Sequence, residues 1–214
     1  MTHPVWPLFD LRVRTPKLEL RYIDDGLATA LAELAARGIH DPGFMPFMLP
    51  WTDQPSPQLE HATMQWYWRA RADTSPARWH LTLAAIVDGA AIGTTSLDAH
   101  DFATLREFES GSWLGRAYQG RGLGKEMREA TLHLGFAGLG AEYATTGAWH
   151  DNGPSLGVTR SLGYLEQGRH RAMRRGEPAE SLTFRMHRDD WQQRLRRDDI
   201  VIDGLAPALP LLGL

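Results

Sequence analysis

The chain has 214 residues, of which 43% are hydrophobic and 23% charged, and its formal net charge is −3. This balance is typical of a globular protein and excludes the strongly basic character of many nucleic-acid-binding chains. The absence of cysteine excludes disulfides, thiolate metal sites and a cysteine nucleophile. No apolar run reaches the length of a membrane span, and residues 1–10 lack a signal-peptide pattern. We therefore expect a cytoplasmic protein without nucleic-acid or membrane partners.

The first predicted elements are a strand and a helix. Residues 15–22 alternate apolar and polar side chains, as a strand with one buried face does. Asp24 or Asp25 can cap the following helix, whose apolar residues recur at helical spacing over 27–35. Gly38 is expected to end this helix.

Residues 40–57 form a long connection that contains five prolines, and these exclude regular secondary structure. The aromatic and methionine side chains between the prolines make the segment too apolar for a solvated linker. Long ordered loops in compact domains are often lids or binding loops, so we interpret this loop as one wall of a substrate site. The alternative is a loop that only fills the core.

A helix is predicted over residues 59–72, with Trp66, Tyr67 and Trp68 in its centre. Residues two apart do not share a helix face. We therefore expect one of the two tryptophans to pack inward and the other to line a cleft or an interface.

Three strand-like runs follow, at 79–87, 91–97 and 107–114, and Asp88-Gly89 is a hairpin signal between the first two. These runs predict an antiparallel meander. The later elements are, in order, a helix at 123–139, a strand at 142–146, a helix at 154–161, strands at 165–173 and 181–186 joined at Gly176-Glu177-Pro178, and a helix at 188–197. The apolar tail, residues 198–214, is expected to pack on the body of the chain or on a second subunit.

A glycine-rich turn, residues 118–125, lies between the last strand of the meander and the helix at 123–139. Glycines at alternate positions leave the backbone N–H groups without a Cβ in the way. The first N–H groups of a helix have no partner inside the helix, and the helix dipole adds positive charge there. The turn therefore predicts an anion site that suits a pyrophosphate.

Three nucleotide-binding patterns can be compared with this turn. A P-loop needs Ser or Thr after its lysine, whereas Lys125 is followed by Glu126. A dinucleotide fingerprint needs a wider glycine spacing on an early strand–helix turn. The pattern Gln/Arg-x-x-Gly-x-Gly/Ala is matched by Gln119, Gly122 and Gly124. A tight turn without a ligand is the remaining alternative.

The order of elements and several motifs resemble the GNAT superfamily of acyl-CoA-dependent N-acyltransferases, over about residues 15–192. Asn152-Gly153-Pro154-Ser155, followed by Leu162-Gly163-Tyr164, is similar to that family's Asn-x-x-Ser/Ala run. Trp113-Leu114-Gly115 and Arg188-Asp189-Asp190-Trp191 resemble the branch of ribosomal-protein N-terminal acetyltransferases. The resemblance implies an α/β (α+β) fold in one domain over 1–214. Its mixed, mostly antiparallel central sheet would have six to seven strands, with helices on both faces.

The resemblance also implies a donor, acetyl-CoA or succinyl-CoA, in a gap where two central strands diverge. Its pantetheine arm would pair with backbone near Trp113 and Leu114, and its pyrophosphate would lie on the N–H groups of residues 121–125. The residues expected at this cofactor are Trp113, Leu114, Gln119, Gly120, Arg121, Gly122, Leu123, Gly124, Lys125, Asn152 and Ser155. The nine histidines show no metal spacing, so no metal is predicted.

Two proton-transfer roles follow from the resemblance, because an ammonium must lose a proton and a thiolate can take one up. Many relatives use a tyrosine as the acid where this chain has Thr159, so Ser155 is the candidate acid here. The alternative is that Ser155 only packs at the helix start. Asn152 is expected to cap that helix.

For the base, Glu109 is the candidate, and it shares strand parity with Glu107 and Trp113. A bulge would change the face that these residues present. Asp101 or a chain of waters could serve as the base instead. The remaining alternative is that Glu109 is a solvated strand residue without a catalytic role.

The predicted function is transfer of an acyl group from acyl-CoA to a primary amine, of a small molecule or of a protein N-terminus or lysine, by direct attack in a ternary complex. The alternative is a non-catalytic acyl-CoA-binding sensor module. The ten arginines at 160–197 are interpreted mainly as solvated surface and ion pairs. A homodimer is expected from the family, with the apolar tail as a further argument.

Overall fold

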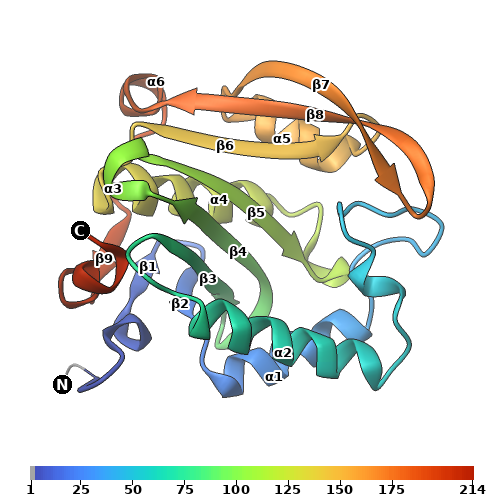
Figure 1. Ribbon diagram of the computed structural model, residues 1–214, viewed down its shortest axis with the longest axis horizontal. Helices are drawn as coiled ribbons and strands as arrows, with labels where there is room; N and C mark the ends of the chain where they lie inside the picture. The colour runs from blue at the N-terminus through green and yellow to red at the C-terminus, as the bar shows by residue number, and fades with distance from the viewer. Residues whose placement is uncertain (1–2) are drawn as a thin grey trace.

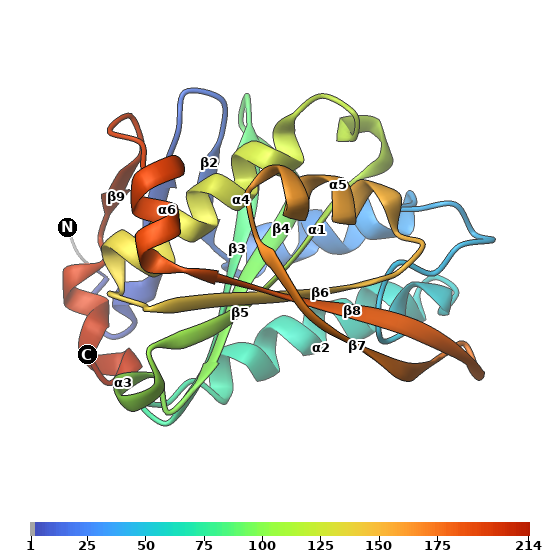
Figure 2. The same cartoon turned by 90° about the horizontal axis from the view of Figure 1, so that it is seen from above.

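The computed structural model describes residues 3–214, in which one mixed sheet of nine strands forms the centre. The strand order is β7-β8-β6-β5-β4-β3-β2-β1-β9. All neighbours pair antiparallel except β5 and β6, which pair parallel. Helices cover both faces of the sheet, with α4, α5 and α6 on one and α1 and α2 on the other (Figure 2). The expected fold class is confirmed.

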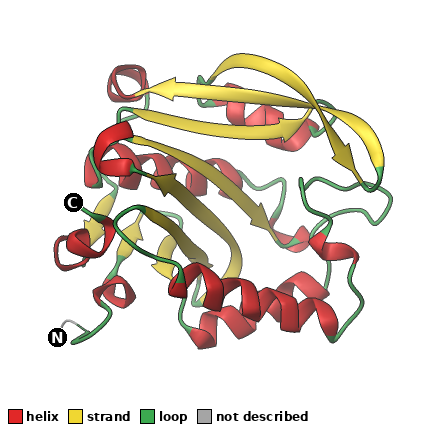
Figure 3. Ribbon diagram, viewed as in Figure 1, coloured by secondary structure: helices red, strands yellow, loops and turns green. Residues whose placement is uncertain are grey.

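The bounds of the elements are as follows (Figures 1 and 3). The strands are β1 Arg12–Arg14, β2 Glu19–Tyr22, β3 Arg78–Val87, β4 Ala90–His100, β5 Glu107–Leu114, β6 Tyr143–Trp149, β7 Leu165–Arg174, β8 Glu177–His187 and β9 Val201–Asp203. The α-helices are α1 Asp25–Ala36, α2 Gln58–Ala72, α3 Phe102–Leu105, α4 Leu123–His133, α5 Gly153–Ser161 and α6 Arg188–Arg194. A π-helical segment, Leu134–Gly138, continues α4.

The sheet has more strands than the six to seven expected, because β1 and β9 are three-residue strands at one edge. The predicted strand at 15–22 is in fact a turn followed by β2, and β1 precedes this turn. In the tail, β9 pairs with β1, and the short helix Ala206–Leu212 buries Ala208 and Leu212 completely. The tail therefore packs on the body of the chain, which removes it as an argument for a second subunit.

Helix α1 begins and ends where its sequence signals lie. Asp24 is the residue that caps it, since its Oδ1 accepts a hydrogen bond from the Leu27 N–H at 2.8 Å. Gly38 takes a φ of +102°, and its N–H donates to the Ala35 carbonyl at 2.9 Å. A left-handed glycine of this kind is a common helix stop.

The expectation for the tryptophans of α2 was wrong, because neither packs inward. Trp66 and Trp68 are 47% and 48% exposed. The helix instead buries the stripe formed by Leu59, Thr63, Tyr67 and Ala70, and Tyr67 lies between the two tryptophans. Trp66 lies against the His80 ring, with centroids 5.8 Å apart, and the Trp68 Nε1 donates to Asp25 at 3.2 Å.

The main core lies between β5 and the helix formed by α4 and its π-helical continuation. Phe108, on β5, is fully buried with its ring 5.9 Å from that of Phe136, which stacks on Trp191 of α6. A Cβ on Gly135 would lie 2.2 Å from the Phe108 ring. Glycine is therefore required at 135 for the helix to approach β5.

A pair of glycine substitutions tests this packing. Gly135→Ala should destabilise the fold by about 1–3 kcal/mol, because the methyl group overlaps the buried Phe108 ring. Gly157→Ala is the matched control, since this helical glycine in α5 has no atom within 4 Å of an added Cβ. The control should be neutral or stabilise by up to about 1 kcal/mol. Urea unfolding of both variants would measure the difference, and equal stabilities would contradict the packing.

Candidate active site

Strands β5 and β6 pair over a short distance and then diverge (Figure 1). Their parallel pairing covers only the three residues Glu107, Phe108 and Glu109 of β5. At the closed end, the Thr146 hydroxyl donates to the Ser110 carbonyl at 2.9 Å. Alternate backbone groups of a strand face each neighbour. The part of β5 beyond Ser110 therefore presents backbone groups to an edge that has no partner strand.

The end of β5 stays against β4 while it leaves β6. A Cβ on Gly93 of β4 would lie 2.2 Å from the Trp113 carbonyl oxygen and 2.8 Å from the Leu114 Cα. Only a glycine permits so close an approach of two backbones. No register shift interrupts the β4–β5 pairing, so Glu107, Glu109 and Trp113 present their side chains on the same face.

The glycine turn lies at the open end of this divergence. Gly120 and Gly122 have φ values of +72° and +78°, and an added Cβ at either would meet no atom within 4 Å. Backbone conformation, not packing, therefore requires glycine there, and the space beside the turn is open. Gly122 is the N-cap of α4 and makes no side-chain cap, so the first N–H groups of the helix face this space.

The Gln119 side chain holds this turn in place. Its Nε2 donates to the carbonyl oxygens of Leu114 at 2.8 Å and Ile39 at 2.7 Å. Both amide protons are therefore directed to backbone carbonyls of the chain. Arg121 and Lys125 beside the turn are exposed. Their positive charges add to the helix dipole in favouring an anion.

The loop 40–57 bridges the separated ends of β5 and β6. The Trp51 ring lies 6.0 Å from that of Trp113, at the end of β5. The Trp149 Nε1, at the end of β6, donates to the Phe47 carbonyl at 3.1 Å. The loop therefore contacts both strands at the open end of their divergence.

Two arginines at the tip of the β7–β8 hairpin anchor the loop. The Arg174 Nε donates to the Met45 carbonyl at 2.8 Å, and its guanidinium lies 4.5 Å from the Phe44 ring. The Arg175 guanidinium forms two hydrogen bonds with the Asp53 carboxylate. In Figure 1 the loop and the hairpin tip lie beside each other. The hairpin and the loop therefore form one wall.

Helix α5 lies on the opposite face, and Asn152 caps it as expected. The Asn152 Oδ1 accepts a hydrogen bond from the Ser155 N–H at 3.3 Å. The Ser155 side chain is half-buried, and its hydroxyl makes no hydrogen bond with another residue in the described part of the chain. Thr159, one turn further on, is buried.

Glu109 lies on the sheet face that also carries Trp113. Partial burial of its carboxyl group raises its pKa, and the negative charge of Asp98 directly across on β4 raises it further. Its strand neighbour Glu107 instead pairs with Arg185 of β8 at 2.9 Å. Asp101 lies at the opposite end of the sheet from the glycine turn, where it begins α3 with a φ of +47°.

The sequence reasoning missed the groups that hold Asp98. The His80 Nδ1 lies 2.6 Å from the Asp98 Oδ1, and the Ser96 hydroxyl donates to its Oδ2 at 2.7 Å. His80, Asp98 and Glu109 therefore form a row across β3, β4 and β5. This row fixes a negative charge beside Glu109.

Arg128 of α4 was also not identified from the sequence as a candidate functional residue, because it belongs to none of the motifs in the sequence. It is 4% exposed, and its Nε and Nη2 have no hydrogen-bond partner. Its guanidinium lies 5.6 Å from the Tyr164 ring. Burying an unpaired ion costs several kcal/mol, whereas a cation–π contact returns about 0.5–2 kcal/mol. The contact with Tyr164 therefore does not offset the cost of burial.

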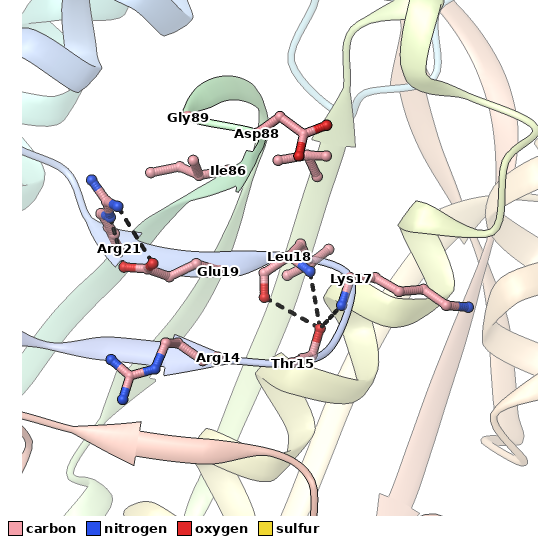
Figure 4. Close-up of a pocket in the computed structure, with 10 residues that line it drawn as sticks. Arg14, Thr15, Lys17, Leu18, Glu19, Arg21, Ile86, Asp88 and Gly89 are labelled. Carbon is pink, nitrogen blue, oxygen red and sulfur yellow. Dashed lines mark hydrogen bonds and ion pairs between the residues drawn. The ribbon is translucent and has the colours of Figure 1, made fainter.

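A shallow pocket of about 260 Å³ lies away from these groups, between the β1–β2 and β3–β4 turns (Figure 4). Its arginines already have partners, because Arg14 pairs with Asp203 and Arg21 with Glu19, each at 2.6 Å. Lys17 extends away from both arginines (Figure 4). The pocket therefore offers little free charge to a ligand.

Two further features of residues 3–214 bear on function. Each helix in this range falls short of the length and apolarity needed to cross a membrane. Over the same range, three or more His, Asp or Glu side chains nowhere gather into a group that could hold a metal ion.

Comparison with solved structures shows the same fold. RimL, a ribosomal-protein α-N-acetyltransferase solved with coenzyme A, is 16% identical over 81% of this chain and 95% of its own, with a TM-score of 0.66. A GNAT-family acetyltransferase from Bacillus anthracis is 15% identical over 83% and 99%, with a TM-score of 0.65. A Vibrio cholerae structure described as a ribosomal-protein-serine acetyltransferase is 18% identical over 87% and 99%, with a TM-score of 0.63.

The sequence itself carries the family assignment. A family model described as the acetyltransferase (GNAT) domain matches residues 17–165, which include the meander, the glycine turn, α4, β6 and α5. This match spans more than half of the chain. The chain therefore belongs to the GNAT acetyltransferase family.

Proposed function

We propose that this protein is an acyl-CoA-dependent N-acyltransferase that moves an acetyl or succinyl group to a primary amine by direct attack in a ternary complex. The observation that carries the proposal is the glycine turn, whose free helix N–H groups face open space at the end of the β5–β6 opening. A diphosphate fits this turn, and an extended amide-bearing chain fits the unpaired edge of β5.

The thioester supplies an activated acyl group and a thiolate leaving group. Residues 121–125 would bind the diphosphate through backbone N–H groups, and the β5 edge near Leu114 would bind the arm. Holding the amine and the thioester in contact can lower the barrier by about 7–11 kcal/mol. The protein's main contribution is therefore position.

The two proton-transfer groups lie on opposite faces of the sheet, which suits an amine that approaches from the loop side. Glu109 takes a proton from the ammonium and releases it to solvent, and the free amine then attacks the thioester carbon. The C–N bond forms, the C–S bond breaks, and the nitrogen gives its second proton to Glu109 as the amide forms. Ser155 gives a proton to the departing thiolate and recovers one from solvent.

The wall formed by the loop 40–57 and the β7–β8 hairpin faces the acceptor in this arrangement. Its aromatic residues, together with the carboxylates of Glu109 and Asp98 further along the sheet, suit a cationic amine with an apolar neighbour. The acceptor class is a small-molecule amine or the N-terminus or a lysine of a protein. The ribosomal-protein names of two similar structures make an N-terminal amine a natural first substrate to assay.

Calorimetric titration with CoA and its acetyl and succinyl thioesters tests the proposal, together with thiol release on a panel of amines. Binding followed by amine-dependent thiol release supports an N-acyltransferase. Binding without release on any amine would favour the acyl-CoA sensor. Absence of CoA binding would overturn the donor site.

Substitution at the glycine turn gives the sharpest test of donor binding. Gly122→Glu should abolish CoA binding, because it places bulk and negative charge where the diphosphate would lie. Gly89→Glu is the matched control, since Gly89 also has a positive φ, +79°, and no atom near an added Cβ. Both variants carry a strain of about 1–2 kcal/mol. Retained CoA affinity in Gly122→Glu, measured by calorimetry, would overturn the assignment.

Ser155→Ala should lower turnover by about 10²-fold or more while CoA affinity changes little, because the hydroxyl acts on the leaving group. Ser161→Ala is a control on the same helix, where the hydroxyl donates to the Val158 carbonyl at 2.9 Å. Steady-state kinetics with a fixed amine would separate the two. Full activity in Ser155→Ala would leave Ser155 with a structural role.

The pH profile of kcat/KM should report the ionisation of the Glu109 carboxyl group. The base must be ionised, so activity rises with pH through the raised pKa of Glu109, above the range of an ordinary glutamate. Asp98→Asn removes a neighbouring negative charge, lowers the pKa of Glu109, and moves this rise to lower pH. Glu109→Gln should remove the rise and lower kcat by about 10²–10⁴-fold. An unchanged profile in both variants would exclude Glu109 as the base.

A further inference from the structure

Arg128 is a buried cation for which the chain supplies no counter-ion. The two nearest acids on α4, Glu126 and Glu129, both pair with Arg197, at 3.0 and 2.6 Å. Within residues 3–214 no carboxylate pairs with the Arg128 guanidinium, and two of its nitrogens are buried without a partner. Buried charges in proteins are normally paired, so an anion from outside the chain is expected here.

The position of Arg128 places this anion at the closed end of the opening. Gly124, one turn earlier on the same helix face, lies against β5, since its Cβ would be 3.7 Å from the Leu114 side chain. The Tyr164 ring that faces Arg128 carries a hydroxyl 3.5 Å from the Ser110 Oγ. Ser110 is the β5 residue at which the strands begin to diverge.

A diphosphate at the glycine turn does not account for this anion. Arg128 is six residues beyond Gly122, roughly 9 Å along the helix axis, and its guanidinium lies against Tyr164 at the Ser110 end of the opening. The neutral amide groups of the arm do not supply a charge. The anion at Arg128 therefore belongs to the end of the donor that carries the acyl group.

We propose that Arg128 binds a carboxylate at the far end of the acyl group, so that the donor is a CoA thioester of a dicarboxylic acid. The planar guanidinium matches a carboxylate with two parallel hydrogen bonds. This inference rests on the proposed function and narrows its donor. During transfer the amine nitrogen bonds to the thioester carbon and the C–S bond breaks, while the distal carboxylate takes no part. The product amide keeps that carboxylate, so a cationic amine becomes an anionic product.

Calorimetry with CoA, acetyl-CoA and succinyl-CoA tests the proposal on the wild-type chain and three variants. The wild type should bind succinyl-CoA more tightly than acetyl-CoA. Arg128→Met should weaken succinyl-CoA binding by about 10- to 100-fold, with CoA and acetyl-CoA little changed. Arg128→Lys keeps the positive charge without the planar guanidinium, so its affinity for succinyl-CoA should lie between those of the wild type and Arg128→Met. Arg78→Met, at an exposed position at the far end of β3, is the control and should bind as the wild type does.

Each other outcome overturns the proposal in a distinct way. Equal loss of affinity for all three ligands in Arg128→Met means that Arg128 contacts the part they share. Unchanged affinities mean that Arg128 only stabilises the fold, which thermal unfolding would show. If Arg128→Met does not fold, an Arg128→Lys variant that binds succinyl-CoA as tightly as the wild type overturns the carboxylate contact. A wild type that binds CoA but prefers acetyl-CoA refutes the acyl assignment alone, whereas a wild type that binds none of the three refutes the donor site itself.

Discussion

A backbone polar group that is removed from water must find a hydrogen-bond partner. Strands β5 and β6 part after three residue pairs, so the backbone groups of β5 beyond this point have no partner on β6. The close approach of Trp113 to Gly93 keeps β5 on β4, so the opening forms only on the β6 side. The glycine turn lies at the wide end of this opening, and the Ser110–Thr146 contact lies at its narrow end. A further element covers each face. A shape of this kind accepts an extended ligand that completes the missing strand edge.

The two faces of the opening differ in chemistry. The face beside the loop 40–57 carries aromatic rings and the carboxylates of Glu109 and Asp98. The loop itself is held by Arg174 and Arg175 of the β7–β8 hairpin. The helix face carries N–H groups, hydroxyl groups and the buried Arg128. One face therefore favours a cation and the other an anion, which suits the proposed pairing of an amine with an acyl-CoA thioester.

Local signals in the sequence were enough for most of the fold and for the conformation of the glycine turn. Four features depend on neighbouring residues, and each was predicted: the bounds of β5, a helix cap at Asp24 or Asp25, the Asp88-Gly89 turn and the glycine turn. The strands β1 and β9 are too short to show the alternation of apolar and polar residues that marks a strand in the sequence. The row from His80 to Glu109 depends on a register shift between Ala85 and Ile86, which moves the partner of His80 by one residue to Asp98. The burial of Arg128 arises from packing against Tyr164, which sequence spacing does not reveal.

Gln119 connects the glycine turn mechanically to the loop 40–57. One amide nitrogen is hydrogen bonded both to Leu114, which ends β5 before the glycine turn, and to Ile39, just before the loop of the acceptor wall. A displacement of the loop therefore strains the turn, and ordering of the turn restrains the loop. If the turn and the loop bind the two proposed substrates, thermodynamic linkage makes such an effect equal in both directions: whatever affinity the first substrate adds to the second, the second adds to the first.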